Sequence, residues 1–272
     1  MILVIGKGHL GRIIADYFDA NLFDGRLETV PDLQIDYATH IINAAGKTDL
    51  AWCEENQVEA SHVNSYLPVQ LARKAKRFGT HFIQLSSGCV WNGPYDKDNK
   101  PFTPNSEPSP ACHYATTKVG CDEALLREIP VPGNRIAILR LRMPYSEVKS
   151  NRNLFTKLLG YKELIDTPNS ITSATVLCET IKKLIDDSLC QLWNRITCVY
   201  DKGMATPYQI GVKLHHAGLR SLPERLTKNK LDAFHKPQRV DTVMHDSLFE
   251  EIMAPRPVGE MLDETLMKFK SS

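Results

Sequence analysis

The sequence predicts an α/β protein built on a doubly wound parallel sheet, followed by a smaller mixed part. The apolar run Ile2–Ile5 is typical of a strand buried on both faces, and it leads directly into the glycine turn Gly6-x-Gly8-x-x-Gly11. Further apolar runs then alternate with segments of helical period, which indicates right-handed βαβ units. A strand, a glycine turn and a helix in this order indicate a sheet of the Rossmann type.

The first half of the chain supplies most of the predicted sheet. The predicted strands alternate with segments of helical apolar spacing, and the loop Gly93–Pro110, which holds five prolines, is long enough to suggest a functional role. Pro68 must kink or divide the longest predicted helix. The expected strands are Ile2–Ile5, Leu22–Phe23, His40–Asn43, His81–Leu85 and Arg135–Leu141, and the expected helices end at Phe18 or span Trp52–Phe78 and Tyr114–Arg127.

After Pro144 the alternation loosens. We therefore expect a nucleotide-binding domain over residues 1–144 and a smaller substrate-binding region over 145–272, with some elements returning to the sheet. This second region should not fold independently. Its expected elements are helices at Asn153–Leu159, Val176–Asp187, Tyr208–His216 and Val258–Lys268, and a strand at Ile196–Tyr200.

Composition narrows the function classes. The 272 residues carry a formal net charge of +1 with scattered Lys and Arg, so neither nucleic acid nor an anionic membrane is an expected partner. No apolar run reaches the ~20 residues of a membrane helix, and the N-terminus does not look like a signal peptide. The seven cysteines form no C-x-x-C pair, which argues for a reducing, cytoplasmic compartment and against a metal site. A homodimer is compatible with the sequence, which does not set the oligomeric state.

The glycine turn predicts a dinucleotide site. Gly6 permits the tight turn, Gly8 lets the backbone approach a pyrophosphate, and Gly11 lets the helix pack against the strand. Free N–H groups at the start of the helix would bind the anion. The cofactor residues expected here and after the third strand are Gly6, Gly8, His9, Leu10, Gly11, Asn43, Ala44 and Ala45.

Two residues after the second strand bear on cofactor choice. Asp24 would bind a ribose 2′-hydroxyl and favour NAD(H), whereas Arg26 would bind a 2′-phosphate and favour NADP(H). We favour NADP(H) and keep NAD(H) as the alternative.

The segment Tyr114–Lys118 indicates proton-transfer chemistry. Residues four apart lie on one face of a helix, so the tyrosine hydroxyl and the lysine ammonium should share one space. We expect the ammonium to lower the pKa of Tyr114 toward neutrality, as a general acid for a developing alkoxide requires.

These motifs resemble those of the extended short-chain dehydrogenases/reductases. The matching pieces are the glycine turn, Asn43–Gly46, the serine-containing end of the fourth strand, and the Tyr/Lys helix. The resemblance implies a nicotinamide-dependent enzyme with Ser87, Tyr114 and Lys118 as its catalytic residues, the last two also contacting the cofactor.

A narrower resemblance runs through nearly the whole chain. It is to the plant nucleotide-rhamnose synthases, which are UDP-4-keto-6-deoxy-glucose 3,5-epimerase/4-reductases, and more distantly to dTDP-4-dehydrorhamnose reductases. The resemblance implies that Cys89 and Lys157 form an epimerase acid/base pair, which the reductases lack. Ser87 stands where the plant enzymes have threonine, and the loop Gly93–Cys112 differs in sequence. The similar segments are Gly25–Glu28, Asp49–Glu54, Ser87–Cys89, Leu139–Pro144, Arg152–Lys157 and Thr167–Ser170.

Several polar residues are candidates for binding a nucleotide-sugar substrate. Arginine suits phosphate through its forked donors. Arg239 lies in Lys236–Arg239, which resembles the family's Pro-Arg stretch, and Arg256 is its rival. Asn64 would either support the site or cap a local kink. The full set is Asn64, Arg142, Arg152, Asn153, Asn169 and Arg239.

The sequence thus favours 3,5-epimerisation followed by 4-keto reduction of an NDP-4-keto-6-deoxy-hexose, giving a product such as NDP-L-rhamnose. A reductase alone would have no use for Cys89 and Lys157. A nucleotide-binding fold is also compatible with a non-catalytic regulatory subunit, and with a 4-epimerase that keeps NAD bound.

Overall fold

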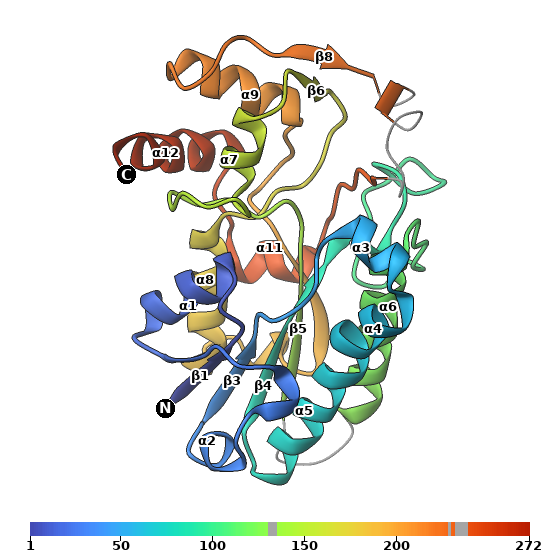
Figure 1. Cartoon of the computed structure of the whole chain (residues 1–272), viewed down its shortest axis with the longest axis vertical. Helices are drawn as coiled ribbons and strands as arrows, with labels where there is room; N and C mark the ends of the chain where they lie inside the picture. The colour runs from blue at the N-terminus through green and yellow to red at the C-terminus, as the bar shows by residue number, and fades with distance from the viewer. Residues whose placement is uncertain (130–134, 228–229, 232–238) are drawn as a thin grey trace.

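A six-stranded parallel sheet forms the centre of the computed structural model, which describes residues 1–129, 135–227, 230–231 and 239–272 (Figure 1). The strand order is β2-β1-β3-β4-β5-β7, so the chain runs outward from β1 in both directions, as in a doubly wound sheet. The predicted fold class is confirmed. The strands are β1 Ile2–Ile5, β2 Asn21–Phe23, β3 His40–Asn43, β4 His81–Ser87, β5 Ile136–Leu141 and β7 Arg195–Val199.

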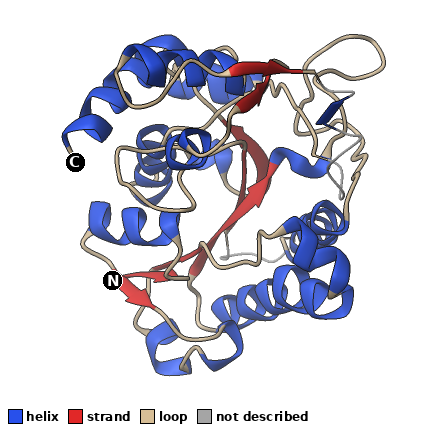
Figure 2. Cartoon of the chain, turned by 45° about the horizontal axis from the view of Figure 1, so that its top comes forward, coloured by secondary structure: helices blue, strands red, loops and turns tan. Residues whose placement is uncertain are grey.

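Helices cover both faces of this sheet (Figure 2). Alternate strand residues face opposite ways: Val4 and Ile83 belong to one buried cluster, whereas Leu3 and Phe82 belong to the other. The first face packs against α1 (His9–Phe18), α8 (Ala174–Ile185) and α11 (Ser247–Met253). The second packs against α2 (Asp32–Asp36), α5 (Leu67–Arg77) and α6 (His113–Glu128).

The long predicted helix Trp52–Phe78 is divided, as Pro68 required. It consists of α3 (Leu50–Glu55), α4 (Gln57–Ser61), a π-helical turn (His62–Tyr66) and α5. Pro68 lies in the first turn of α5, where its missing N–H costs least. The π-helical turn directly before it carries the buried Asn64.

The remaining elements form a second, smaller layer above the carboxyl ends of the strands (Figure 1). They surround a separate apolar core that includes Phe155, Leu214 and Phe269. The short strands β6 (Glu163–Ile165) and β8 (Glu224–Leu226) pair in parallel, and neither was predicted. The helices of this layer are α7 (Leu154–Leu159), α9 (Pro207–His216) and α12 (Val258–Ser271).

One buried carboxylate ties together three chain segments that cross between the two cores. Asp201, just after β7, accepts hydrogen bonds from the Tyr145 hydroxyl (2.8 Å) and the Ser173 hydroxyl (2.6 Å). Tyr145 follows β5, and Ser173 caps α8. Burial raises the pKa of Asp201 to about 6. We call these three residues the Asp201 joint.

The proline-rich loop is anchored at its start and middle. The Trp91 and Phe102 rings stack with centroids 5.3 Å apart. Phe102 also exchanges backbone hydrogen bonds with Val243 and His245.

Among the described residues, no helix has both the length and the apolar character needed to cross a bilayer.

Candidate active site

The glycine turn has the geometry that its spacing predicts. Gly6 has φ of 104°, and a Cβ added there would lie 2.7 Å from the backbone of Ala45. A Cβ on Gly11 would lie 1.8 Å from the Gly6 carbonyl oxygen, so helix and strand approach too closely for any other residue. A Cβ on Gly8, by contrast, would meet nothing within 4 Å. Protein atoms therefore pack closely against Gly6 and Gly11, whereas there is free space beside Gly8.

This open side lies at the N-terminus of α1. Gly8 is the N-cap and offers no side chain, and the first helical bond runs from Arg12 N to Gly8 O (3.1 Å). The N–H groups of His9, Leu10 and Gly11 have no partner within the helix, so they suit a pyrophosphate. The Leu10 side chain packs on the sheet core, so only its backbone can contribute.

Charged side chains gather where β2 ends. Lys7, within the glycine turn, forms an exposed ion pair with Asp24 (3.7 Å). Arg26 follows and begins the short 3₁₀ segment Leu27–Thr29. Sequence reasoning overlooked Lys7, although its place in the turn could have indicated it.

The Asn43 side chain is directed into the protein. It is fully buried, donates to Gln84 Oε1 (2.8 Å) and accepts from the Ala45 N–H (3.2 Å). It therefore shapes the loop after β3, where the other predicted cofactor residues lie. Ala44 and Ala45 themselves lie against Gly11 and Gly6.

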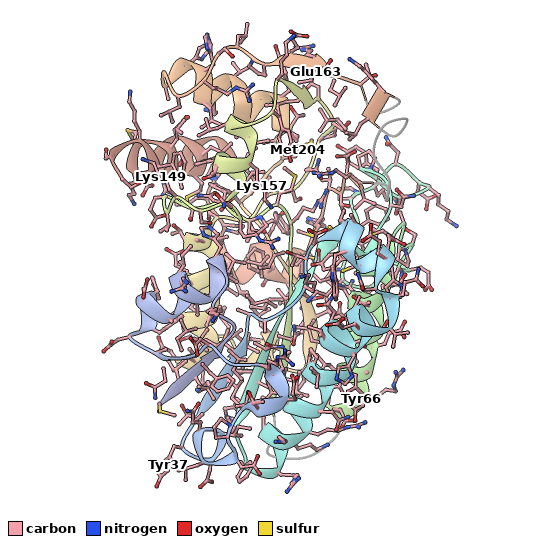
Figure 3. The ribbon with its side chains drawn as sticks, viewed as in Figure 1. Tyr37, Tyr66, Lys149, Lys157, Glu163 and Met204 are labelled. Atoms are coloured by element: carbon pink, nitrogen blue, oxygen red, sulfur yellow. The ribbon has the colours of Figure 1, made fainter. Side chains whose placement is uncertain are left out.

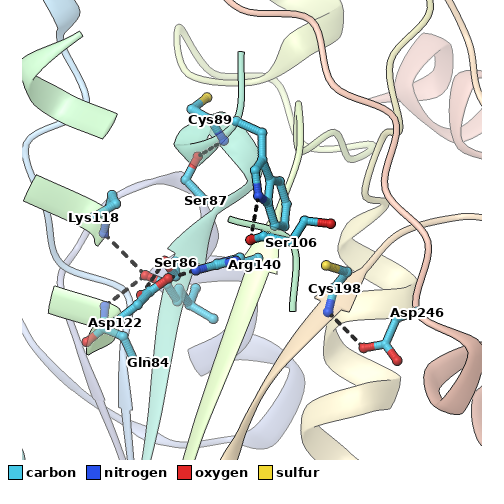
Figure 4. Close-up of polar contacts among 12 residues, drawn as sticks. Gln84, Ser86, Ser87, Cys89, Ser106, Lys118, Asp122, Arg140, Cys198 and Asp246 are labelled. Carbon is cyan, nitrogen blue, oxygen red and sulfur yellow. Dashed lines mark hydrogen bonds and ion pairs between the residues drawn. The ribbon is translucent and has the colours of Figure 1, made fainter. Parts of the chain in front are cut away.

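Ser87 and Cys89 lie together at the end of β4 (Figure 4), and Tyr114 of α6 lies beside them. The Ser87 hydroxyl accepts from the Cys89 N–H (3.1 Å) and hydrogen-bonds the Tyr114 side chain. Burial, reinforced by the nearby Cys89, raises the pKa of Tyr114 well above its usual value. Lys118 is buried and donates to the Leu85 carbonyl oxygen (3.3 Å). The expectation that Lys118 lowers the pKa of Tyr114 is therefore wrong in this structure, because burial dominates.

Beneath these residues lies a buried ionic network that sequence reasoning missed. Asp122, one helical turn after Lys118, accepts from the Ser86 hydroxyl (2.7 Å) and from Arg140 Nε (2.9 Å), as Figure 4 shows. Arg140 in turn lies over the Trp91 ring at 4.7 Å. The network fixes α6 against β4 and β5, and so fixes the positions of Tyr114 and Lys118. Its sequence signal was the four-residue step from Lys118 to Asp122.

Arg142 and Asn169, two predicted substrate residues, are bonded to each other. The Arg142 guanidinium donates to Asn169 Oδ1 (2.9 and 2.7 Å), to the Val240 carbonyl oxygen and to Cys89 Sγ (3.0 Å). Asn169 is fully buried and also donates to Asp241 Oδ1 (2.9 Å). In this structure both side chains are held by the protein itself.

Two further predicted substrate residues, both asparagines, hold backbone segments in place. Asn153 is the N-cap of α7 and also donates to the backbone carbonyls of Ser146 (2.8 Å) and Val148 (2.7 Å). Asn64 bonds both the N–H (2.8 Å) and the carbonyl (2.9 Å) of Lys47, which holds the loop beside Lys118. Each amide is buried and already satisfied.

A positive cluster surrounds Lys157 on α7, which Figure 3 labels where that helix faces the sheet layer. Burial lowers the pKa of Lys157, and the charges of Arg152 and Arg239 lower it further. Arg152 also donates to Thr48 Oγ1 (3.2 Å), beyond the end of β3. The structure thus brings these three predicted residues together. Arg256 instead pairs with Glu264 (2.7 Å) on the surface of α12.

The fold and this site can now be compared with known proteins. A family model described as the RmlD substrate binding domain matches residues 25–203, which is more than half of the chain. The chain belongs to this family.

Curated relatives of this RmlD-family chain include rhamnose-synthesis enzymes. The bifunctional dTDP-4-dehydrorhamnose 3,5-epimerase/dTDP-4-dehydrorhamnose reductase of Arabidopsis thaliana is 27% identical over 215 residues, 71% of this chain and 68% of that protein. A trifunctional UDP-glucose 4,6-dehydratase/3,5-epimerase/reductase of the same plant is 29% identical over 216 residues, but the match covers only 31% of its length. This chain therefore spans about a third of the trifunctional relatives. The predicted resemblance to plant rhamnose synthases is confirmed.

Solved structures give the same fold for the RmlD-family chain. The L780 UDP-rhamnose synthase of Acanthamoeba polyphaga mimivirus superposes with a TM-score of 0.84 at 18% identity, over 98% of this chain and 99% of that one. The dTDP-4-dehydrorhamnose reductase of Bacillus anthracis, solved with NADP, gives 0.78 at 15% identity over 98% and 97%. Other neighbours were solved with NADPH or with NAD.

Proposed function

We propose that this RmlD-family protein reduces the C4 ketone of a nucleotide-linked 4-keto-6-deoxy-hexose with NADPH and also inverts C3 and C5. One observation supports it most directly: Cys89 lies two residues after Ser87, at the end of β4, and beside Tyr114 of α6. Groups for reduction and for proton transfer at carbon are thus within one site. Family membership and the named relatives supply the substrate class.

The glycine turn and the α1 N-terminus would hold the cofactor. The open space at Gly8 fits a pyrophosphate, and Lys7 and Arg26 fit the 2′-phosphate of NADPH. When bound, NADPH supplies a hydride to C4 of the sugar. Solved neighbours that hold NADP or NADPH support this choice of cofactor.

Tyr114 is the proposed proton donor in the reduction. As hydride reaches C4, the C4 oxygen gains the electron pair of the carbonyl and takes the Tyr114 proton, giving an alcohol. The Ser87 hydroxyl orients the carbonyl oxygen toward Tyr114. Lys118, held by the Leu85 carbonyl oxygen, adds positive charge nearby. The tyrosinate then regains a proton from solvent.

Cys89 and Lys157 are the proposed pair for inversion. One of them removes the proton at C5, the C–H electron pair becomes a C4–C5 double bond, and the C4 oxygen takes the negative charge. The other then returns a proton to the opposite face, which restores the ketone, and C3 is inverted in the same way. The lowered pKa of Lys157 favours the loss of its proton, which proton exchange with a sugar carbon requires. His113 is a weaker candidate base, because its ring is held by Ser61 (3.0 Å) and the Gln57 carbonyl (2.9 Å).

A reductase without epimerase activity is the second candidate. It is favoured by the reductase of Mycobacterium tuberculosis, 33% identical over 91 residues, although that match covers only 33% of this chain and 30% of that protein. The two functions differ in a single measurable step, the exchange of the C3 and C5 protons with solvent.

Deuterium exchange tests the choice. UDP- and dTDP-4-keto-6-deoxy-glucose are incubated in D₂O with the protein and NADP⁺, which blocks reduction, and C3 and C5 are followed by NMR. Wild type should exchange both protons, whereas Cys89→Ala and Lys157→Ala should not. Cys190→Ala and Lys162→Ala, at exposed positions, are the matched controls. Both active-site variants should still reduce a 4-keto sugar that already has the inverted configuration. Wild type that exchanges neither proton would leave the protein a reductase only.

The compartment and the assembly stay proposals of the same kind. All seven cysteines are free thiols, which fits a reducing compartment such as the cytoplasm. A homodimer is the assembly that we propose to test by light scattering.

A further inference from the structure

One guanidinium N–H points at the sulfur of Cys89. Arg142 Nη1 lies 3.0 Å from Cys89 Sγ, which is within hydrogen-bond distance of a sulfur. Each residue lies just beyond the end of a strand: Cys89 is in the 3₁₀ segment Gly88–Val90 after β4, and Arg142 directly follows β5. Because the last residues of these strands, Ser87 and Leu141, pair in register, the sheet brings the two segments together.

The rest of the guanidinium is fixed. Asn169 Oδ1 accepts from Nε and Nη2, and the Val240 carbonyl oxygen also accepts from Nη2. Asn169 is itself held by Asp241 (2.9 Å) and by the Thr242 N–H (3.0 Å). Only 8% of Arg142 and none of Asn169 is exposed. This shell leaves the guanidinium one orientation, with Nη1 on the sulfur.

The charges around the sulfur give this contact a chemical meaning. Cys89 lies beside two other ionisable side chains, those of Tyr114 and Cys112, and packs against a largely apolar cluster. Arg142 is the cation in hydrogen-bond contact with the sulfur. A charged donor in a poorly hydrated place strongly stabilises an anion.

We propose that Arg142 is a positioning residue for Cys89: it orients the sulfur and stabilises the thiolate that remains when the thiol gives up its proton. This inference rests on the proposed inversion for its catalytic consequence, but the interaction itself is a property of the free protein. It also explains why an arginine of the site is directed inward and is not left for the substrate diphosphate, a role that Arg152 and Arg239 suit better.

Thiol alkylation tests the interaction without substrate. The wild-type protein, Arg142→Lys and Arg142→Met are treated with iodoacetamide between pH 6 and 9, and alkylation of the Cys89 and Cys190 peptides is followed by mass spectrometry. We expect Arg142→Met to slow Cys89 alkylation at pH 7 about tenfold, because the thiolate loses the cation in contact with it. Arg142→Lys should recover most of the rate, and the exposed Cys190 should be unaffected in both.

Substrate exchange then connects the interaction to the reaction. Arg142→Met should exchange C3 and C5 protons at least tenfold more slowly than wild type. Its reduction of a sugar already inverted should change less than threefold. Circular dichroism and thermal melting establish that each variant is folded.

Arg142→Gln, which keeps polar donors but removes the charge, replaces Arg142→Met if the latter does not fold, and it should slow Cys89 alkylation about tenfold as well. A Cys89 alkylation rate that is unchanged in a folded Arg142→Met or Arg142→Gln overturns the proposal. Slower alkylation in these variants, together with a wild type that exchanges no deuterium, would refute the inversion and leave the Arg142 interaction standing.

Discussion

The buried position of the Tyr114 side chain favours its protonated form. Its side chain is buried beside Cys89, which raises its pKa, and its hydrogen bond to Ser87 fixes the direction of the hydroxyl. A group that must arrive at the reaction with its proton gains from such a setting. The same burial means that removing the hydroxyl alters chemistry more than packing.

Tyr114→Phe should lower NADPH oxidation by about 10²–10⁴-fold, the range that general acid catalysis typically supplies. The cofactor affinity should change little, which fluorescence titration with NADPH would measure. Ser87→Ala should lower turnover less, because the tyrosine proton remains. A Tyr114→Phe protein that retains most of its turnover would rule out this proton donor.

The second residue-level prediction concerns two cations, Lys7 within the glycine turn and Arg26 after β2. Arg26→Ala should raise the KM for NADPH and leave that for NADH nearly constant, since a lost bond to a phosphate costs about 1.5–3 kcal/mol. Lys7→Ala should do the same and also release Asp24 from its ion pair. Steady-state kinetics with both cofactors measure this. A wild-type preference for NADH would instead make Asp24 the selecting residue.

Motif residues could be predicted from the sequence, but buried polar residues could not. Gly6, Gly11 and the Tyr114–Lys118 pair have roles that local spacing determines. Arg142 and Asn169 are residue types that suit a diphosphate equally well. Their true partners are far along the chain, 27 positions apart for this pair, and only the fold brings them together.

At the scale of elements, the strand–turn–helix unit at the N-terminus separates packing from binding. Gly11 faces the protein, whereas Gly8 faces open space. Gly11→Ala therefore tests the packing of helix on strand, and Gly8→Ala tests the binding of the cofactor, although both add the same methyl group.

Gly11→Ala should fold poorly or lose several kcal/mol of stability, because its Cβ would meet the Gly6 carbonyl oxygen at 1.8 Å. Gly8→Ala should retain its melting temperature within a few degrees and bind NADPH at least tenfold more weakly, since the methyl group enters the space of the pyrophosphate. Thermal melting and cofactor titration on both variants check this. Equal melting temperatures for the two would contradict it.

The main helices and strands followed from apolar periodicity, and the missed elements have little of it. Strands β6 and β8 are three residues each and hold few buried side chains. The π-helical turn has no periodic signature of its own, although Pro68 correctly placed the break. Such elements are determined by the tertiary surroundings.

At the scale of the whole molecule, the edge of the sheet opposite the site carries an aromatic cluster. His40 and His81 start adjacent strands in register, with ring centroids 5.1 Å apart, and both lie near Trp193. Burial, the neighbouring His81 and the N-terminal ammonium lower the pKa of His40 to about 4. The pKa of His81 is also lowered, chiefly by burial.

Acid should therefore weaken the fold through this cluster. In the unfolded chain both histidines bind a proton near the reference pKa of 6.5. In the folded chain His40 binds its proton only when the pH falls to about 4. Stability is fully present above pH 6.5 and is lost as the pH falls from 6.5 to 4. His40→Phe should reduce that loss by on the order of 1–2 kcal/mol, discounted for partial exposure. Urea unfolding at pH 7 and pH 4.5 measures it, with the exposed His62→Gln as control.

The Asp201 joint has a mechanical consequence. Tyr145 follows β5, Ser173 precedes α8 and Asp201 follows β7. Because the Asp201 carboxylate accepts hydrogen bonds from both other residues, it connects three of the segments that join the two layers. Rotating one layer on the other would require all three bonds to break together in a place that water does not reach. We therefore expect the two layers to behave as a stiff body. We then expect a substrate to enter through small displacements of the loops around the site, and not through rotation of one layer away from the other.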